Sequence, residues 1–112
     1  MPLKLYYEKR RLNVSLSGEI DHHVAAALRE QIDQAIAKHS PTWLVLDFGG
    51  VTFMDSSAVG LVMGRYKVLS AMGGTLEVIN LSPVAYRMMK MSNLQSLAKL
   101  SPKVQEKERS HA

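Results

Sequence analysis

The chain has 112 residues and 46% hydrophobic amino acids, values typical of one globular domain. It has no cysteine, which excludes disulfides and thiolate metal sites and agrees with a reducing compartment. Its net charge of +4 includes one basic cluster, Lys9–Arg11, and basic residues in the polar C-terminal tail, but the others are dispersed and no basic stripe with interleaved aromatic residues is present, so we expect no nucleic-acid binding. No apolar run approaches the roughly 20 residues that cross a bilayer, so we expect a soluble, cytoplasmic protein without membrane contact.

Alternating hydrophobic residues predict two strands at the start of the chain. Residues Leu3–Tyr7 alternate loosely, and Leu12–Ser17 alternates strictly, with apolar and polar side chains on opposite faces. Gly18 is expected to end the second strand, and Asp21 to cap the helix that follows. Apolar residues at helical spacing then predict a helix over residues 24–39.

Two strand–helix units follow. Trp43–Phe48 is a nearly continuous apolar run, typical of a strand inside a sheet, and Gly49–Gly50 is a turn signal. A helix is predicted over residues 57–72, because apolar residues recur at helical spacing and two glycines end the run. Residues Thr75–Ile79 predict another strand, and Pro83–Met91 a helix that opens on proline.

The end of the chain predicts a short helix and a tail. Leucines three residues apart favour a helix over residues 93–100, and the polar residues 101–112 favour a flexible tail outside a domain at residues 1–100. The order of elements predicts an α/β fold, with a mainly parallel four-stranded sheet, an N-terminal antiparallel edge strand and about four helices. The loops after the parallel strands then gather at one edge, where we expect the functional site.

The strongest chemical signal is the sequence Asp55–Ser56–Ser57 at the expected start of a helix. Free backbone N–H groups and the positive end of the helix dipole make this place suited to an anion. A phosphate here would bring negative charge to a surface that a partner covers, and would remove binding without unfolding the domain. The other interpretation is a helix N-cap with no further role.

Other polar residues give weaker signals. Asp47 lies inside an apolar strand, so it either points to solvent or accepts hydrogen bonds from backbone N–H groups of the following loops. His22, His23 and His39 have no metal-ligand spacing and belong to no triad motif, so we expect neither a metal nor a catalytic site. No glycine-rich phosphate motif is present, so no cofactor is expected.

Four segments, in their order along the chain, resemble the anti-sigma factor antagonists of the STAS class, in particular those that act in sporulation. The resemblance spans residues 3–100 and implies the STAS fold and a regulatory protein that is not an enzyme. The four segments are Gly18–His23, Leu44–Phe48, Phe53–Ser57 and Gly64–Lys67.

The resemblance also implies a mechanism. Such antagonists, when unphosphorylated, bind an anti-sigma factor that is a serine kinase, and this frees the sigma factor for transcription. The kinase inactivates the antagonist by phosphorylating the serine that corresponds to Ser56, and a serine phosphatase restores it. The residues expected to support this site or bind the partner are Asp21, His22, Asp47, Asp55, Ser57 and Ala58.

Ala58 departs from the family pattern, in which glycine commonly follows the two serines. Its methyl group is expected to alter how closely a kinase approaches Ser56. We expect a monomer when the protein is free. The alternatives are a protein-binding module of the same fold in another stress-signalling circuit, and a STAS domain that binds a nucleotide.

Overall fold

A five-stranded sheet in the order β1-β2-β3-β4-β5 forms the centre of the structure, a computed structural model that describes residues 2–104. The first pair of strands is antiparallel, and the remaining pairs are parallel. The predicted antiparallel edge strand and parallel core are therefore confirmed. The strands are β1 (Leu3–Glu8), β2 (Arg11–Ile20), β3 (Trp43–Met54), β4 (Thr75–Leu81) and β5 (Lys99–Pro102).

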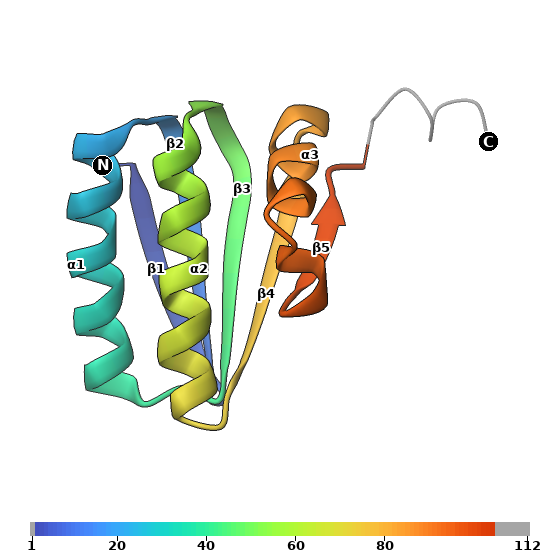
Figure 1. The fold of residues 1–112 in the computed structure, drawn as a ribbon. Coiled ribbons are helices and arrows are strands. Elements are labelled where there is room, and N and C mark those ends of the chain that lie inside the picture. The colour runs from blue at the N-terminus through green and yellow to red at the C-terminus, as the bar shows by residue number, and fades with distance from the viewer. Residues whose placement is uncertain (1, 105–112) are drawn as a thin grey trace.

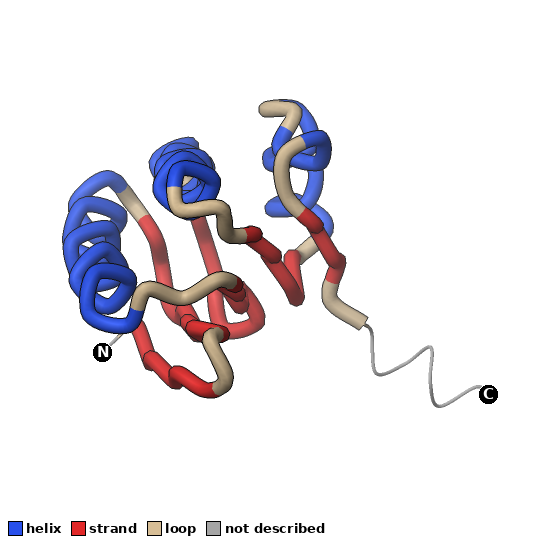
Figure 2. Tube along the Cα trace, turned by 90° about the horizontal axis from the view of Figure 1, so that it is seen from below, coloured by secondary structure: helices blue, strands red, loops and turns tan. Residues whose placement is uncertain are grey.

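Three α-helices, α1 (His22–His39), α2 (Ser56–Ala71) and α3 (Pro83–Met91), lie on one face of this sheet, as Figures 1 and 2 show. Strand β2 shows why the helices cover only one face of the sheet, since its buried and exposed residues alternate as predicted. Its buried residues Leu12, Val14 and Leu16 belong to the core, whereas Ser15 and Ser17 are exposed. None of the helices in residues 2–104 combines the length and hydropathy that crossing a bilayer requires.

Helices α1 and α2 are joined by an ion pair next to the core. Arg65 of α2 is buried, and its Nε lies 3.1 Å from Asp33 Oδ1 of α1, although the alignment is too poor for a hydrogen bond. Burial lowers the pKa of Arg65 and outweighs the opposite effect of the Asp33 carboxylate. The pair therefore holds a desolvated charge between the two helices that carry the candidate site.

The last element differs from the prediction, because residues 93–100 do not form an α-helix. Residues Leu94–Ser96 form one 3₁₀ turn, and residues 99–102 form the fifth strand. Only Leu94 is fully buried among the three leucines of the predicted helix face, because the chain turns at Asn93 and then pairs with the open edge of β4. Two residues of the predicted tail thus belong to β5, and residues 105–112 of that tail lie outside the described residues.

The predictions for two glycine positions are also wrong. Gly49–Gly50 does not form a turn, because β3 continues through it to Met54. A Cβ on Gly50 would lie 2.8 Å from the Ser17 Cβ, so glycine is needed here for close approach of β2 and β3. Gly18 has a φ of +80° and lies at a shift of register, so β2 bends there and continues to Ile20.

Candidate functional site

The three helices begin at the same edge of the sheet, and each begins with a capping side chain. Asp21 accepts a hydrogen bond of 2.9 Å from Val24 N–H at the start of α1. Asp55 accepts one of 2.8 Å from Ser57 N–H in α2, and Ser82 accepts one of 3.1 Å in α3. The predicted gathering of loops at the carboxyl ends of parallel strands is therefore confirmed, and Ser82 is a cap that the sequence analysis did not single out.

Ser56 is the first residue of α2 and is exposed. The preceding Asp55 donates its backbone N–H to Ile20 O over 3.2 Å, which fixes this loop against the end of β2 beside Asp21. Two carboxylates therefore lie on adjacent loops at the edge that presents the Ser56 hydroxyl. Since α2 has 16 residues, its dipole places partial positive charge at the same point.

The Asp21 carboxylate is stabilised in its charged form. The hydrogen bond from Val24 N–H is the main cause that lowers the pKa of Asp21, and the charge of His23 adds to it. Asp21 is exposed, so its charge faces solvent or a partner. A second negative group added nearby would therefore meet an ionised carboxylate at neutral pH.

The residues that follow Ser56 face different surroundings. Ser57 is half-buried and lines a hollow of about 300 Å³ between α1 and α2, together with His22, Arg29 and Gly60. Ala58 is fully buried in the hydrophobic core. The methyl group packs inside the domain, so Ala58 does not contact a partner directly, and an effect on kinase approach stays a prediction.

Asp47 lies apart from this group. Its Oδ1 accepts hydrogen bonds from Gly49 N–H at 2.8 Å and from Asn80 Nδ2 at 2.9 Å. It lines a separate hollow with Lys4, Asn80 and Lys103. Along β3, Asp47 precedes the last residue, Met54, by roughly 20 Å of strand at about 3.3 Å per residue. The structure therefore agrees with the interpretation that Asp47 bonds to the following backbone, and it does not bring Asp47 to Ser56.

An apolar hollow between the end of β3 and the start of α3 is not predicted by the sequence analysis. It has a volume of about 370 Å³, and it is lined by Phe48, Val51, Phe53 and Val84 among other residues. Phe53 and Val84 are 57% and 58% exposed, high values for such large apolar side chains. The sequence analysis predicts only an apolar segment before the serines, because a run of apolar residues does not show which of them face the core.

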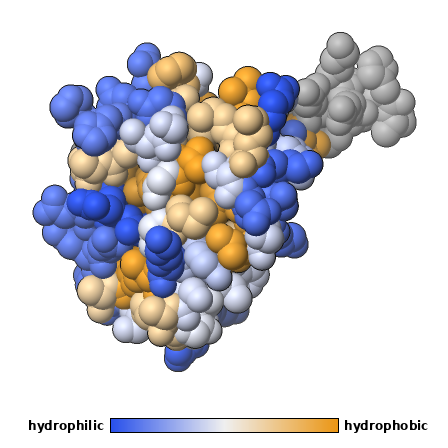
Figure 3. All heavy atoms as spheres, in the orientation of Figure 1, coloured by the Kyte–Doolittle hydropathy of each residue, from blue (hydrophilic) through white to orange (hydrophobic). Residues whose placement is uncertain are grey.

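The helix-covered side of the molecule divides into surfaces of different polarity. Figure 3 shows hydrophilic residues gathered over α1 at the left, and hydrophobic residues along the middle, over α2. The sequence of α2 explains this contrast, because it contains only two charged residues, Arg65 and Lys67, and Arg65 is buried. The α2 surface next to Ser56 thus carries little charge. Within residues 2–104, no group of three or more His, Cys, Asp or Glu side chains is arranged to hold a metal ion.

Comparison with known proteins gives consistent matches. The family model of the STAS domain matches residues 6–107. An anti-sigma F factor antagonist of Paenibacillus polymyxa is 40% identical over 96 residues, which cover 84% of this chain and 82% of the relative.

Two solved structures share both fold and sequence with the chain. The anti-sigma factor antagonist SpoIIAA in its unphosphorylated form has a TM-score of 0.77 and 32% identity, with 96% of this chain and 92% of that chain covered. The Bacillus cell fate determinant SpoIIAA in its phosphorylated form has a TM-score of 0.72 and 32% identity, with 97% and 96% covered. The chain therefore belongs to the STAS domain family, among the anti-sigma factor antagonists.

Proposed function

We propose that the protein is an anti-sigma factor antagonist that, when unphosphorylated, binds an anti-sigma factor with serine kinase activity and so frees a sigma factor for transcription. Phosphorylation of Ser56 by this kinase ends the binding, and a serine phosphatase restores it. The observation that carries the proposal is the exposed hydroxyl of Ser56 at the start of α2, beside the capping residues Asp21 and Asp55.

The geometry supports a switch that acts through charge. A phosphate on Ser56 adds about −1.5 to −2 charges at neutral pH. The nearby carboxylates of Asp55 and Asp21 already carry negative charge, so the modified edge becomes strongly anionic. A partner that binds the neutral hydroxyl against these carboxylates then meets repulsion and lost contacts.

The same geometry supports a local effect without unfolding. Ser56 is exposed, so a phosphate group displaces no buried side chain. The N-terminal turn of α2 offers backbone N–H groups and a favourable dipole to an anion. The relative SpoIIAA agrees with this, since its unphosphorylated and phosphorylated forms both match this fold, with TM-scores of 0.77 and 0.72.

The surroundings of Ser56 also favour a protein partner. The exposed side chains of Phe53 and Val84 border an apolar hollow close to the switch, and the surface of α2 carries little charge. Apolar and aromatic groups near the centre of an interface contribute most of the binding energy in protein complexes. The 40% identity to an anti-sigma F factor antagonist supports a role in sporulation.

The proposal is tested with a candidate anti-sigma kinase, ATP and peptide mapping by mass spectrometry. The parent chain and the Ser57→Ala variant should each gain one phosphate at Ser56. The Ser56→Ala variant should bind the kinase but gain no phosphate. Phosphate on Ser57 in the parent chain or in the Ser56→Ala variant, or no phosphate on Ser56 in the Ser57→Ala variant, would show that the site is assigned to the wrong serine.

A second variant tests the consequence of the charge. Ser56→Asp should weaken kinase binding while its circular dichroism spectrum stays that of the parent. Asp carries less charge than phosphate, so we expect a loss of about tenfold or more in affinity. A variant that loses its folded spectrum would show that Ser56 supports the helix instead of serving as a switch.

A further inference from the structure

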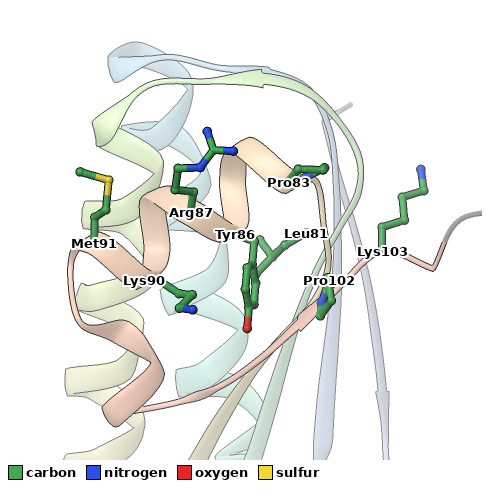
Figure 4. Close-up of a pocket in the computed structure, with 8 residues that line it drawn as sticks. All are labelled: Leu81, Pro83, Tyr86, Arg87, Lys90, Met91, Pro102 and Lys103. Atoms are coloured by element: carbon green, nitrogen blue, oxygen red, sulfur yellow. The ribbon is translucent and has the colours of Figure 1, made fainter.

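A groove outside the Ser56 edge lies between α3 and the C-terminal strand. We call it the α3–β5 groove, and Figure 4 shows the eight residues that line it. Its volume is about 700 Å³, larger than the hollows lined by Ser57 and by Phe53. The lining residues are Leu81, Pro83, Tyr86, Arg87, Lys90, Met91, Pro102 and Lys103.

The charged residues of the groove all have the same sign. Arg87, Lys90 and Lys103 line it, and none of its lining residues is acidic. Lys103 Nζ donates a hydrogen bond of 3.2 Å to Gly49 O and points away from the other lining residues, toward the hollow of Asp47, so the positive charge of the groove comes mainly from Arg87 and Lys90 (Figure 4). Arg87 and Lys90 are exposed and lie three residues apart on α3, which places them on neighbouring positions of one helix face.

The remaining lining residues are largely apolar. Leu81 is fully buried and forms part of the floor, where its carbonyl accepts the Lys103 N–H at 2.8 Å. Pro83 and Pro102 line the groove beside it, and Met91 is 81% exposed at its far end. An exposed thioether and proline rings give an adaptable apolar surface between the cationic groups.

Two features of the groove argue against nucleic acid or an added β-strand as its ligand. Lys90 Nζ lies 5.5 Å from the centre of the Tyr86 ring, so one face of the ring already has a cation over it and is not a free platform for nucleic-acid bases. Pro102 has no backbone N–H, which weakens β5 as an edge for an added strand. Affinity in this groove must therefore come from side chains.

We propose that the α3–β5 groove docks an acidic segment of a partner protein. Carboxylates of the segment pair with Arg87 and Lys90, and one of its apolar side chains packs against Tyr86 and Pro102. Charge complementarity selects this occupant, because Arg87 and Lys90 form no ion pair with any residue in the described range 2–104. A cationic rim of this kind around an apolar floor matches a chain of alternating acidic and apolar residues. Of the lining residues only Pro83, at the start of α3, lies at the edge where the helices begin, and the groove includes neither Ser56 nor its capping neighbours Asp21 and Asp55, so this inference stands apart from the proposed switch.

The test uses the full chain labelled with ¹⁵N and a blocked heptapeptide of alternating glutamate and leucine as the probe. Amide shifts should change at Tyr86, Arg87, Lys90 and Lys103, and binding should weaken as salt rises. The same peptide with glutamine in place of glutamate should bind at least about tenfold more weakly. Equal binding of the two peptides would overturn the proposal.

Matched variants separate the groove from overall charge. Arg87→Glu combined with Lys90→Glu should abolish peptide binding, whereas Lys9→Glu combined with Lys38→Glu has the same net charge and should bind within about twofold of the parent. Arg87→Gln combined with Lys90→Gln gives a milder loss and serves if the first pair fails to fold. Unchanged binding by the Gln pair would contradict the inference.

Two further outcomes would also overturn it. The Ser56→Asp variant should bind the peptide like the parent, so a loss of binding would place the peptide at the Ser56 edge instead of the groove. A short oligothymidine should leave the shifts of Tyr86 and Arg87 unchanged. Binding of that oligonucleotide in preference to the peptide would assign the groove to nucleic acid.

Discussion

Replacement of Ala58 by glycine tests how the helix start is packed beside the switch. Ala58 is fully buried as the third residue of α2, so its methyl group contacts the core and no partner. Loss of a buried methyl costs about 0.8 kcal/mol, and glycine in a helix costs up to about 1 kcal/mol relative to alanine. We therefore expect Ala58→Gly to lower the free energy of unfolding by about 1–2 kcal/mol.

This change is measured by thermal circular dichroism and by the initial rate of phosphorylation. The melting temperature should fall by roughly 5–15 °C for a domain of this size, whereas the rate of phosphate transfer at Ser56 should stay within about twofold of the parent at a temperature where both are folded. A tenfold rise in rate with the fold intact would show that the methyl group limits kinase access after all, and would refute the reasoning.

A control variant exists in the same helix. Gly60 is exposed, and a Cβ added there would meet nothing within 4 Å. Gly60→Ala should therefore raise the free energy of unfolding by about 0.5–1 kcal/mol, opposite in sign to Ala58→Gly. A loss of stability in Gly60→Ala would show that the packing of this helix face differs from the structure.

Three further predictions concern the caps and the buried ion pair. Asp55→Ala should lower the free energy of unfolding, measured by urea titration, by about 1 kcal/mol through loss of the cap to Ser57 N–H. Asp55→Asn should keep most of this stability, because asparagine can also cap. Equal losses in the two variants would argue against capping. Asp33→Ala leaves the buried Arg65 without its counter-charge and should lower the free energy of unfolding by about 1–3 kcal/mol. Adding Arg65→Met should recover part of that loss, because it removes the buried charge. No recovery would show that desolvation of Arg65 is not the cause. The pKa of Asp21, measured by carbon-detected NMR, should lie below 3.8, because the hydrogen bond from Val24 N–H stabilises the ionised carboxylate. The stability that this carboxylate contributes is therefore present at a pH above the pKa of the unfolded chain and is lost as the pH falls through the pKa of the folded chain. A pKa at or above 3.8 would rule out the cap in solution.

Local patterns were enough to predict most elements and the position of the site. The strict alternation of Leu12–Ser17 predicted a one-sided strand, and the Asp55–Ser56–Ser57 signal predicted the start of α2 within one residue. These features depend on side-chain periodicity and on capping, which act over a few residues. The carboxyl-edge cluster then followed from the rule for parallel strands.

The errors arose where pairing between distant strands overrides local preference. Gly49–Gly50 has the composition of a turn, but Gly50 is a strand residue because the backbone of Ser17 approaches it closely. Leu97 and Leu100 have helical spacing with Leu94, yet residues 99–102 form a strand because the edge of β4 offers unpaired backbone groups. Such contacts have no local sequence signature.

The burial of the site residues also could not be predicted from local sequence patterns. Ala58 was expected at the partner surface on the basis of family comparison alone, and its burial appears only once α2 packs on the sheet. The exposed Phe53 lies in a run of apolar residues, and the sequence does not show which of them face the core. Burial depends on how the elements pack together, so a single sequence leaves it open.

A phosphate on Ser56 should end partner binding while the domain stays folded. Isothermal titration of an anti-sigma kinase into the unphosphorylated chain and into the chain fully phosphorylated at Ser56 tests this most directly. We predict an affinity at least about 100-fold lower for the phosphorylated chain, or about 2.7 kcal/mol, with an unchanged circular dichroism spectrum. Affinities within twofold of each other, or a loss of binding that accompanies unfolding, would contradict the account.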